Sequence, residues 1–325
     1  MILNIIPKKG EYTDCKQHLL ITVAEWWNRR YELLFIKSCS LNFNSKNSDL
    51  RLIGERLETS RFNAYNYFEE YHGVKIIISD ITEETNIINM IITNIRNNHP
   101  VVVSLNSFWT PWNTFAYKKI KANHYCLVIG INERDKILYC LDPTYSMEIL
   151  ELPFTDFING CTKSYAYFEK MDPLQPDIIK IFGEVNQTLK KVNTPAIEEF
   201  ALEVGESFDF KREIIDFPRL SDAPININLV KIIFGHQYLS KGLDYLGSIN
   251  PNILRDMKKI RSELNDITIR WKLVHNIISK EYMLFQKSRE IPTIARISPM
   301  IRDLGEREAY FKSNFESFYQ KLICI

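Results

Sequence analysis

Apolar residues recur with two different spacings along this chain, and the spacing changes within MDPLQPD at residues 171–177. Before this segment, short runs rich in β-branched residues alternate with helical segments, and beyond it strand-like runs are nearly absent. Two prolines and two aspartates mark the change, and both residue types favour turns. The sequence therefore predicts an α+β fold, with an N-terminal domain at residues 1–172 and an all-α helical domain at residues 173–325.

The first domain is predicted to contain one antiparallel sheet with helices around it. Apolar residues at helical spacing predict helices at 15–31, 61–71, 85–97 and 154–159. Runs of β-branched or alternating apolar residues predict strands at 74–79, 101–105, 124–131, 136–141, 147–152 and 164–169. Turn-forming residues join the three strands from 124 to 152, as in successive antiparallel strands.

The second domain is predicted to be a helical bundle. Helical spacing extends over 176–191, 195–207, 226–246, 251–286 and 297–322, and prolines fall at or near the ends of these segments. Aromatic residues at helical spacing near the C-terminal end are expected in the core of the bundle: Tyr310, Phe311, Phe315, Phe318 and Tyr319.

Charge and hydropathy restrict the partners of this protein. The chain has 41 Lys and Arg residues against 40 Asp and Glu residues, so no net field attracts it to nucleic acid or to an anionic membrane. Its short N-terminal apolar run precedes the basic residues, the reverse of the order in a signal peptide, and no apolar stretch approaches the ~20 residues of a membrane span. We therefore expect a cytoplasmic protein.

The six cysteines are scattered, without the paired spacing of a zinc site. A reducing compartment disfavours disulfides, so we expect neither disulfides nor a metal or other cofactor. Cys126 and Cys140 lie inside apolar runs and are expected in the core. Cys15, in contrast, lies in a polar setting at a predicted helix start, after the candidate caps Thr13 and Asp14.

Three residues are placed for nucleophilic catalysis. His124 begins one predicted strand and Asp142 ends the next, so an antiparallel hairpin brings them together. The carboxylate then fixes the imidazole tautomer and leaves the second ring nitrogen to accept a proton. A helix N-terminus and a nearby imidazolium favour the thiolate of Cys15. We expect Cys15 as nucleophile, His124 as base and Asp142 as orienter, whereas His18, one turn after Cys15, lacks an orienting carboxylate.

The sequence has a cysteine at a predicted helix start, followed by HYCLVIG and then by LDPTY. This pattern resembles the papain-like superfamily of cysteine enzymes in its bacterial forms. Two branches of this superfamily resemble the chain. One is the bacteriocin-processing peptidases, which cleave leader peptides on an ABC transporter. The other is the family of butirosin biosynthesis protein H, in which a similar N-terminal domain is followed by a second domain. The second branch is closer to the two-domain layout of this chain. The resemblance covers about residues 1–172.

The second resemblance implies an acyltransferase in antibiotic or other secondary-metabolite biosynthesis. It implies that Cys15 accepts an acyl group from the thioester of an acyl carrier protein or peptidyl carrier protein, and that a small amine receives the acyl group. A thioesterase, a cysteine peptidase or amidase with the same triad, and a noncatalytic papain-like binding module are the alternatives.

Two positions depart from the papain-like pattern. No Gln precedes the cysteine as oxyanion donor, and Lys16 replaces the Gly that often follows it. The backbone N–H of Cys15 is the candidate donor, with the side chains of Gln17 or Asn4. A missing donor costs about 2.7–4 kcal/mol of transition-state stabilisation, which favours reactive thioesters over amides as substrates.

An aromatic loop precedes His124. The aromatic residues of this loop are Phe108, Trp109, Trp112, Phe115 and Tyr117. They form either the wall of a channel for the acyl group or pantetheine, or a satellite hydrophobic cluster. With Gln17, Trp109 and Trp112 are the candidate substrate-binding residues.

Overall fold

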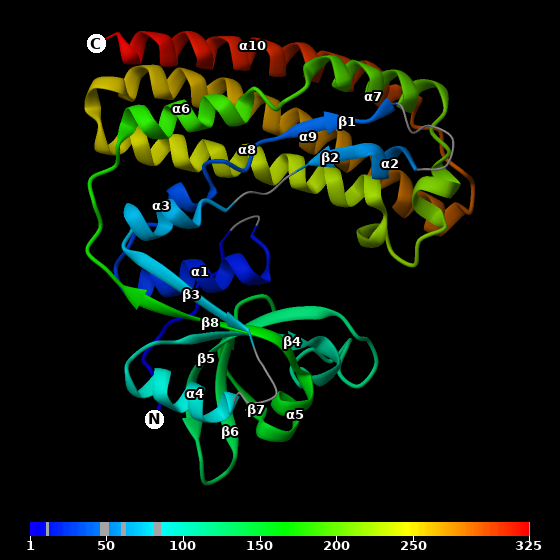
Figure 1. Ribbon diagram of the computed structural model, residues 1–325. Coiled ribbons are helices and arrows are strands. Elements are labelled where there is room, and N and C mark those ends of the chain that lie inside the picture. Colours follow the sequence, from blue (N-terminus) through cyan, green and yellow to red (C-terminus); the bar gives the residue numbers. More distant parts are fainter. Residues whose placement is uncertain (11–12, 46–51, 60–62, 81–85, 325) are drawn as a thin grey trace. The chain divides into compact units, whose positions relative to one another are not determined.

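The computed structural model describes residues 1–10, 13–45, 52–59, 63–80 and 86–324, leaving aside the side chains of residues 162–164. These residues form two compact units (Figure 1). The first comprises Met1–Tyr31 and Tyr65–Gln175, and we call it the sheet unit. The second comprises Glu32–Ala64 and Pro176–Ile325, and we call it the helical unit.

The sheet unit is built on six strands in the order β3-β8-β4-β5-β6-β7, and every neighbouring pair is antiparallel. In chain order the strands are β3 (Val74–Asp80), β4 (Val101–Asn106), β5 (Asn123–Asn132), β6 (Ile137–Asp142), β7 (Ser146–Pro153) and β8 (Cys161–Lys170). The predicted antiparallel sheet is confirmed.

Short helices cover the sheet: α1 (Cys15–Trp26), α3 (Tyr65–Glu70), α4 (Ile87–Arg96) and α5 (Phe154–Gly160). Helix α1 packs against β5 and β6, and α5 packs against β4, β7 and β8. Leu20 of α1 shares a pocket with Val102, whereas Gly160 of α5 lies against Leu105. Because Val102 and Leu105 point to opposite faces of β4, α1 and α5 lie on opposite faces of the sheet. The predicted helix starts at residues 61 and 85 lie outside the described residues.

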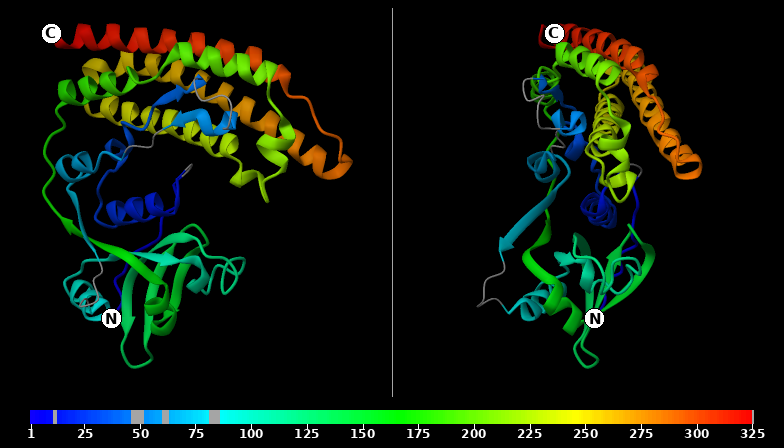
Figure 2. Two further views of the ribbon diagram at one scale, coloured as in Figure 1. Left: turned by 45° about the vertical axis from the view of Figure 1, so that its right-hand side comes forward. Right: turned by 90° about the vertical axis from the view of Figure 1, so that its right-hand side faces the viewer.

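Long helices make up most of the helical unit. They are α6 (Ile178–Leu189), α7 (Thr194–Glu206), α8 (Pro224–Ile249), α9 (Leu254–Ser288) and α10 (Ser298–Ile323), as the sequence predicted to within a few residues. Helix α9 packs against α8 and α10, and α6 and α7 lie along α10 (Figure 2). In the described part of the chain, no helix combines the length and apolar character needed to cross a bilayer.

The segment Glu32–Ala64 belongs to the helical unit, although it precedes most of the sheet in the sequence. It forms η1 (Glu32–Phe35), β1 (Leu41–Phe43), α2 (Ile53–Arg56) and β2 (Leu57–Thr59), and β1 pairs with β2. Phe35 stacks on Tyr238 of α8 at 4.6 Å between ring centroids. The helical unit therefore includes a two-stranded sheet in addition to its helices, and the predicted domain boundary between residues 172 and 173 stays a prediction.

Candidate active site

Helix α1 begins with a reciprocal capping box that fixes its first turn. The Asp14 carboxylate accepts a hydrogen bond from the Gln17 N–H at 2.9 Å, and the Gln17 side-chain oxygen accepts one from the Asp14 N–H at 3.1 Å. Such a box orients the first backbone N–H groups of a helix. Among the described residues, the N–H groups of Cys15 and Lys16 have no acceptor. Partly exposed Cys15 thus lies at a helix N-terminus with two available donors beside it.

His124 and Asp142 meet where β5 begins and β6 ends. The two strands pair antiparallel, with Leu127 opposite Leu141, which aligns these two ends. The His124 Nε2 lies 2.6 Å from the Asp142 Oδ2, and both side chains are buried. Since Nε2 is engaged by the carboxylate, Nδ1 is the nitrogen left to exchange a proton with the Cys15 sulfur.

Asp142 is fully buried, and three donors compensate for its loss of water. Besides His124, the Trp112 Nε1–H donates to Oδ2 at 2.7 Å, and the Thr144 N–H donates to Oδ1 at 3.3 Å. The carboxylate is therefore held from three sides. The Trp112 contact was not predicted, because nothing in the sequence indicates which atom an indole in a loop will approach.

The imidazole of His124 is charged at neutral pH. Burial lowers its pKa, but hydrogen bonds with Asp142 and Cys15 outweigh burial and raise the pKa to about 9. Tyr145 packs edge-on against the imidazole ring at 5.2 Å, and its hydroxyl accepts a hydrogen bond from Asn113 at 2.7 Å. The site therefore holds the imidazole of His124 between the Asp142 carboxylate and the Cys15 side chain, and this arrangement supports a nucleophilic cysteine.

The three residues predicted to bind substrate have structural contacts. Gln17 is buried in the capping box of α1, and Trp112 donates to Asp142. The Trp109 ring lies against Gly160 and 3.3 Å beneath the Lys118 ammonium. Substrate binding by these three residues stays a prediction, and none of them lines the pocket between helix α1 and the sheet.

The remaining candidates near the site are less suited to catalysis. The His18 Nδ1 lies 3.4 Å from the Thr144 hydroxyl, and burial lowers the pKa of this imidazole. Burial also raises the pKa of Cys161 to about 12, which disfavours its thiolate. No group of three or more His, Cys, Asp or Glu side chains in the described ranges is placed to hold a metal ion.

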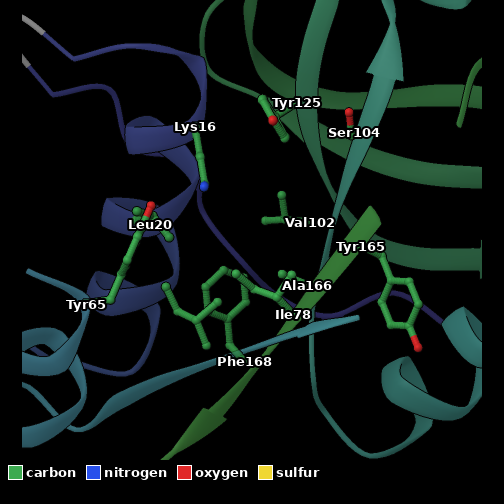
Figure 3. Close-up of a pocket in the computed structure, with 11 residues that line it drawn as sticks. Lys16, Leu20, Tyr65, Ile78, Val102, Ser104, Tyr125, Tyr165, Ala166 and Phe168 are labelled. Carbon is green, nitrogen blue, oxygen red and sulfur yellow. The ribbon is translucent and has the colours of Figure 1, made fainter. Parts of the chain in front are cut away.

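The sheet unit contains a pocket of about 70 Å³ (Figure 3). Helices α1 and α3 and strands β3, β4, β5 and β8 contribute to it. Its lining includes Lys16, which follows Cys15, and Tyr125, which follows His124. The sequence offered no signal for this pocket, because its other residues occur in ordinary strand patterns.

Part of the chain matches a known protein family. Residues 43–172 match the sequence model described as the Peptidase_C39 like family, which is related to papain-like cysteine peptidases. The matched part contains His124 and Asp142 and begins after Cys15. The match indicates a cysteine-dependent hydrolase or transferase of papain-like type. No curated protein matches the chain.

Proposed function

We propose that this protein is a cysteine acyltransferase that moves an acyl group from a thioester to a small amine through an acyl-Cys15 intermediate. The donor is the thioester of an acyl carrier protein or peptidyl carrier protein. One observation carries the proposal: His124 bonds Asp142 through Nε2 at 2.6 Å and also interacts with the side chain of Cys15.

The first half-reaction acylates the enzyme. The Cys15 thiolate attacks the thioester carbonyl, and the oxyanion accepts hydrogen bonds from the N–H groups of Cys15 and Lys16. The bond from the carbonyl carbon to the donor sulfur then breaks, and the leaving thiolate takes the proton of the His124 imidazolium. The products are a free thiol, acyl-Cys15 and neutral His124.

The second half-reaction restores the enzyme. The amine attacks acyl-Cys15 while neutral His124 takes a proton from the amine nitrogen, so that an amide forms and Cys15 leaves as the thiolate. Asp142 holds the imidazole in one orientation throughout and stabilises its charged form.

The oxyanion donors favour a thioester over a peptide as substrate. The side-chain oxygen of Gln17 accepts a hydrogen bond within the capping box, and the backbone N–H groups of Cys15 and Lys16 begin the helix that carries the nucleophile. A thioester is intrinsically more reactive than an amide, so it depends less on a complete oxyanion hole. This argument supports acyl transfer rather than proteolysis.

Acyl transfer is tested by intact-protein mass spectrometry after incubation with a simple acyl N-acetylcysteamine thioester. We expect one acyl adduct on Cys15, and its loss when a small amine is added. Cys15→Ala should remove the adduct, whereas Cys324→Ser, which replaces an exposed cysteine of the helical unit, should retain it. Absence of an adduct on wild-type Cys15 would contradict the proposal.

A cysteine peptidase is the second candidate, and the match to the Peptidase_C39 like family favours it. A panel of peptides separates the two functions. A peptidase would cleave members of the panel at rates independent of added amine, whereas an acyltransferase would form amides from thioesters in proportion to the amine.

A further inference from the structure

We propose that Tyr145 keeps water away from the acyl-Cys15 intermediate, so that the acyl group passes to the amine and is not hydrolysed, and that Asn113 holds the Tyr145 ring in the position this requires. The inference rests on the proposed function, because it concerns the fate of an acyl group on Cys15. Neither Tyr145 nor Asn113 takes part in the two half-reactions described above.

A tight turn after β6 places Tyr145 against the base. Asp142 ends β6, and the Tyr145 N–H donates to the Asp142 backbone carbonyl at 3.0 Å. Pro143 stands at the second position of the turn, where the fixed φ of proline is favoured. The Tyr145 ring lies edge-on to the imidazole of His124, with 5.2 Å between the ring centres. The carboxylate that orients the base and the ring that packs against the base therefore belong to the same turn.

The Tyr145 ring covers the base on its solvent side. His124 is 5% exposed, whereas Tyr145 is 46% exposed, so the ring packs against a buried imidazole on one side and meets water on the other. Burial raises the pKa of Tyr145, and so do the charges of Asp142 and Cys15. The ring is therefore near the nucleophile as well as the base, and its hydroxyl stays neutral at pH 7.

A hydrogen bond from a buried amide fixes the ring in this position. The Asn113 Nδ2 donates to the Tyr145 hydroxyl at 2.7 Å, and Asn113 is buried. The Asn113 Oδ1 accepts a hydrogen bond from the Ala116 N–H at 3.1 Å, which sets the orientation of the amide. Trp112, the residue before Asn113, donates to the Asp142 carboxylate. Two adjacent loop residues thus hold the first and last residues of the turn.

Hydrolysis of acyl-Cys15 needs the same base as transfer to an amine. Water attacks the carbonyl carbon, neutral His124 takes a proton from it, and the carbon–sulfur bond breaks to give a carboxylic acid and the Cys15 thiolate. Exclusion of water from a closed site is a general way to suppress hydrolysis of a reactive intermediate. Without the Tyr145 ring, the space beside the polar groups of His124 and Asp142 could hold water. Tyr145 therefore determines which acceptor takes the acyl group.

The test follows isolated acetyl-Cys15, prepared with the acetyl thioester of N-acetylcysteamine and freed of excess thioester. Mass spectrometry of the intact protein gives its decay constant without amine, and the ratio of acetate to acetylglycinamide is measured with glycinamide as acceptor. Only molecules folded well enough to be acylated contribute, so a loss of folded protein does not change either quantity. In Tyr145→Ala, we expect both quantities to rise about tenfold or more.

Two further variants assign the effect. Tyr145→Phe keeps the ring but loses the hydrogen bond from Asn113, so both quantities should rise about threefold, as for the loss of one neutral hydrogen bond. Tyr310→Ala removes an exposed tyrosine of the helical unit, and it should keep the wild-type values.

The outcomes separate this inference from the proposed function. An unchanged decay constant or product ratio in Tyr145→Ala, with acetyl transfer by the wild-type protein intact, would overturn this inference alone. Wild-type values in Tyr145→Phe would overturn the role of Asn113. If the wild-type protein formed no acetyl-Cys15, or if its acetyl-Cys15 gave no acetylglycinamide, the proposed function would fall and this inference with it.

Discussion

Asp142 holds His124, the proposed catalytic base, and is itself held by other residues of the sheet unit. Its Oδ2 accepts hydrogen bonds from both His124 and Trp112, at 2.6 and 2.7 Å, and its Oδ1 accepts one from the Thr144 N–H. The hydrogen bond that Asp142 accepts from His124 is also the largest of the contributions that raise the pKa of His124. The protonation of His124 therefore depends strongly on this buried carboxylate.

Replacement of Asp142 by Asn should move the pH dependence of the enzyme. His124 is protonated below its pKa of about 9, so wild-type acylation of Cys15 should decline as the pH rises through about 9. In the Asp142→Asn variant, burial still lowers the pKa of His124, but no carboxylate raises it. The decline in the acylation rate of Cys15 should therefore occur at lower pH. The acylation rate near pH 7 should also fall by about 100-fold or more. A pH profile of kcat/KM checks both effects, and an unmoved alkaline limb would contradict the assignment.

Trp112 is predicted to act as a positioning residue through Asp142. Trp112→Phe removes one hydrogen bond to a buried charge, which typically contributes about 1.5–3 kcal/mol, so we expect acylation of Cys15 to slow by about tenfold or more. The carboxylate would then interact more strongly with His124, and the alkaline limb should move to higher pH. Trp27→Phe, at the opposite end of α1, serves as control. A slower rate with the same pH profile would indicate a merely structural role.

The sequence pointed to three residues for the candidate site but not to the contacts that support them. Cys15, His124 and Asp142 followed from a helix start and from two adjacent strands, which are local patterns. Trp112 donates to Asp142, a contact that the sequence did not indicate. The contact between Trp112 and Asp142 depends on the conformation of an irregular loop. The spacing of apolar residues in the sequence does not predict that conformation.

At the scale of elements, helix α1 presents both the nucleophile and its backbone donors. The capping box of Asp14 and Gln17 fixes the first turn, in which Cys15 and Lys16 follow the cap directly. A local sequence motif therefore fixes the helix turn that holds the proposed oxyanion donors.

Asp14→Ala should loosen that turn. Loss of an N-cap side chain typically lowers the free energy of unfolding by about 1 kcal/mol, which denaturant titration would detect. Acylation of Cys15 should slow as well, because the N–H groups that hold the oxyanion become less ordered. Asp14→Ser retains a capping oxygen and should restore both properties. If Asp14→Ala lowered stability but left the acylation rate unchanged, the capping box would have no part in the site.

Elements with strong periodicity were predictable, whereas the orientation of single residues was not. The five long helices lie close to their predicted ranges, because proline and apolar spacing define helix ends and faces locally. Of the aromatic residues expected in the bundle core, Phe311, Phe315 and Phe318 are buried, but Tyr310 is 60% exposed. Tyr310 and Phe311 are neighbours on one helix, about 100° apart, and it is Phe311 that lies on the same face as Phe315 and Phe318.

At the scale of the molecule, each compact unit is made of two segments that are not continuous in the sequence. The Ile53 and Gly54 N–H groups donate to the buried carboxylate of Glu213, at 2.6 and 3.1 Å, so a segment from early in the sequence completes the helical unit. Contacts between residues so distant in sequence leave no local pattern. The sequence therefore indicated two fold types correctly without indicating which segments pack together.

The helical unit contains a buried charge pair of its own. The His236 Nε2 lies 2.7 Å from the Glu308 Oε1, which also accepts a hydrogen bond from the Trp271 Nε1 at 3.1 Å. The His236 Nδ1 donates to the Ile232 carbonyl at 2.7 Å. Burial lowers the pKa of His236, but Cys39 and Glu308 outweigh it and raise the pKa well above 6.5.

This pair should make the stability of the helical unit depend on pH. Because the folded-state pKa of His236 is raised, its stabilising contribution is complete below about pH 6.5 and is lost as the pH rises through the folded-state value. Glu308→Leu leaves a buried imidazolium without its partner and should cost about 3–5 kcal/mol of unfolding free energy. His236→Leu with Glu308→Leu should cost less. Denaturant titration at pH 6 checks both, and a double variant less stable than Glu308→Leu would contradict this account.

The central claim, that His124 activates Cys15, is tested most directly by the rate of Cys15 alkylation with iodoacetamide at pH 6. The exposed Cys324 in the same molecule is the reference for an ordinary thiol. We predict that wild-type Cys15 reacts at least about tenfold faster than Cys324, because the imidazolium stabilises its thiolate, and that this difference disappears in His124→Ala. Equal rates for the two cysteines in the wild-type protein, or a ratio unchanged in His124→Ala, would contradict the account.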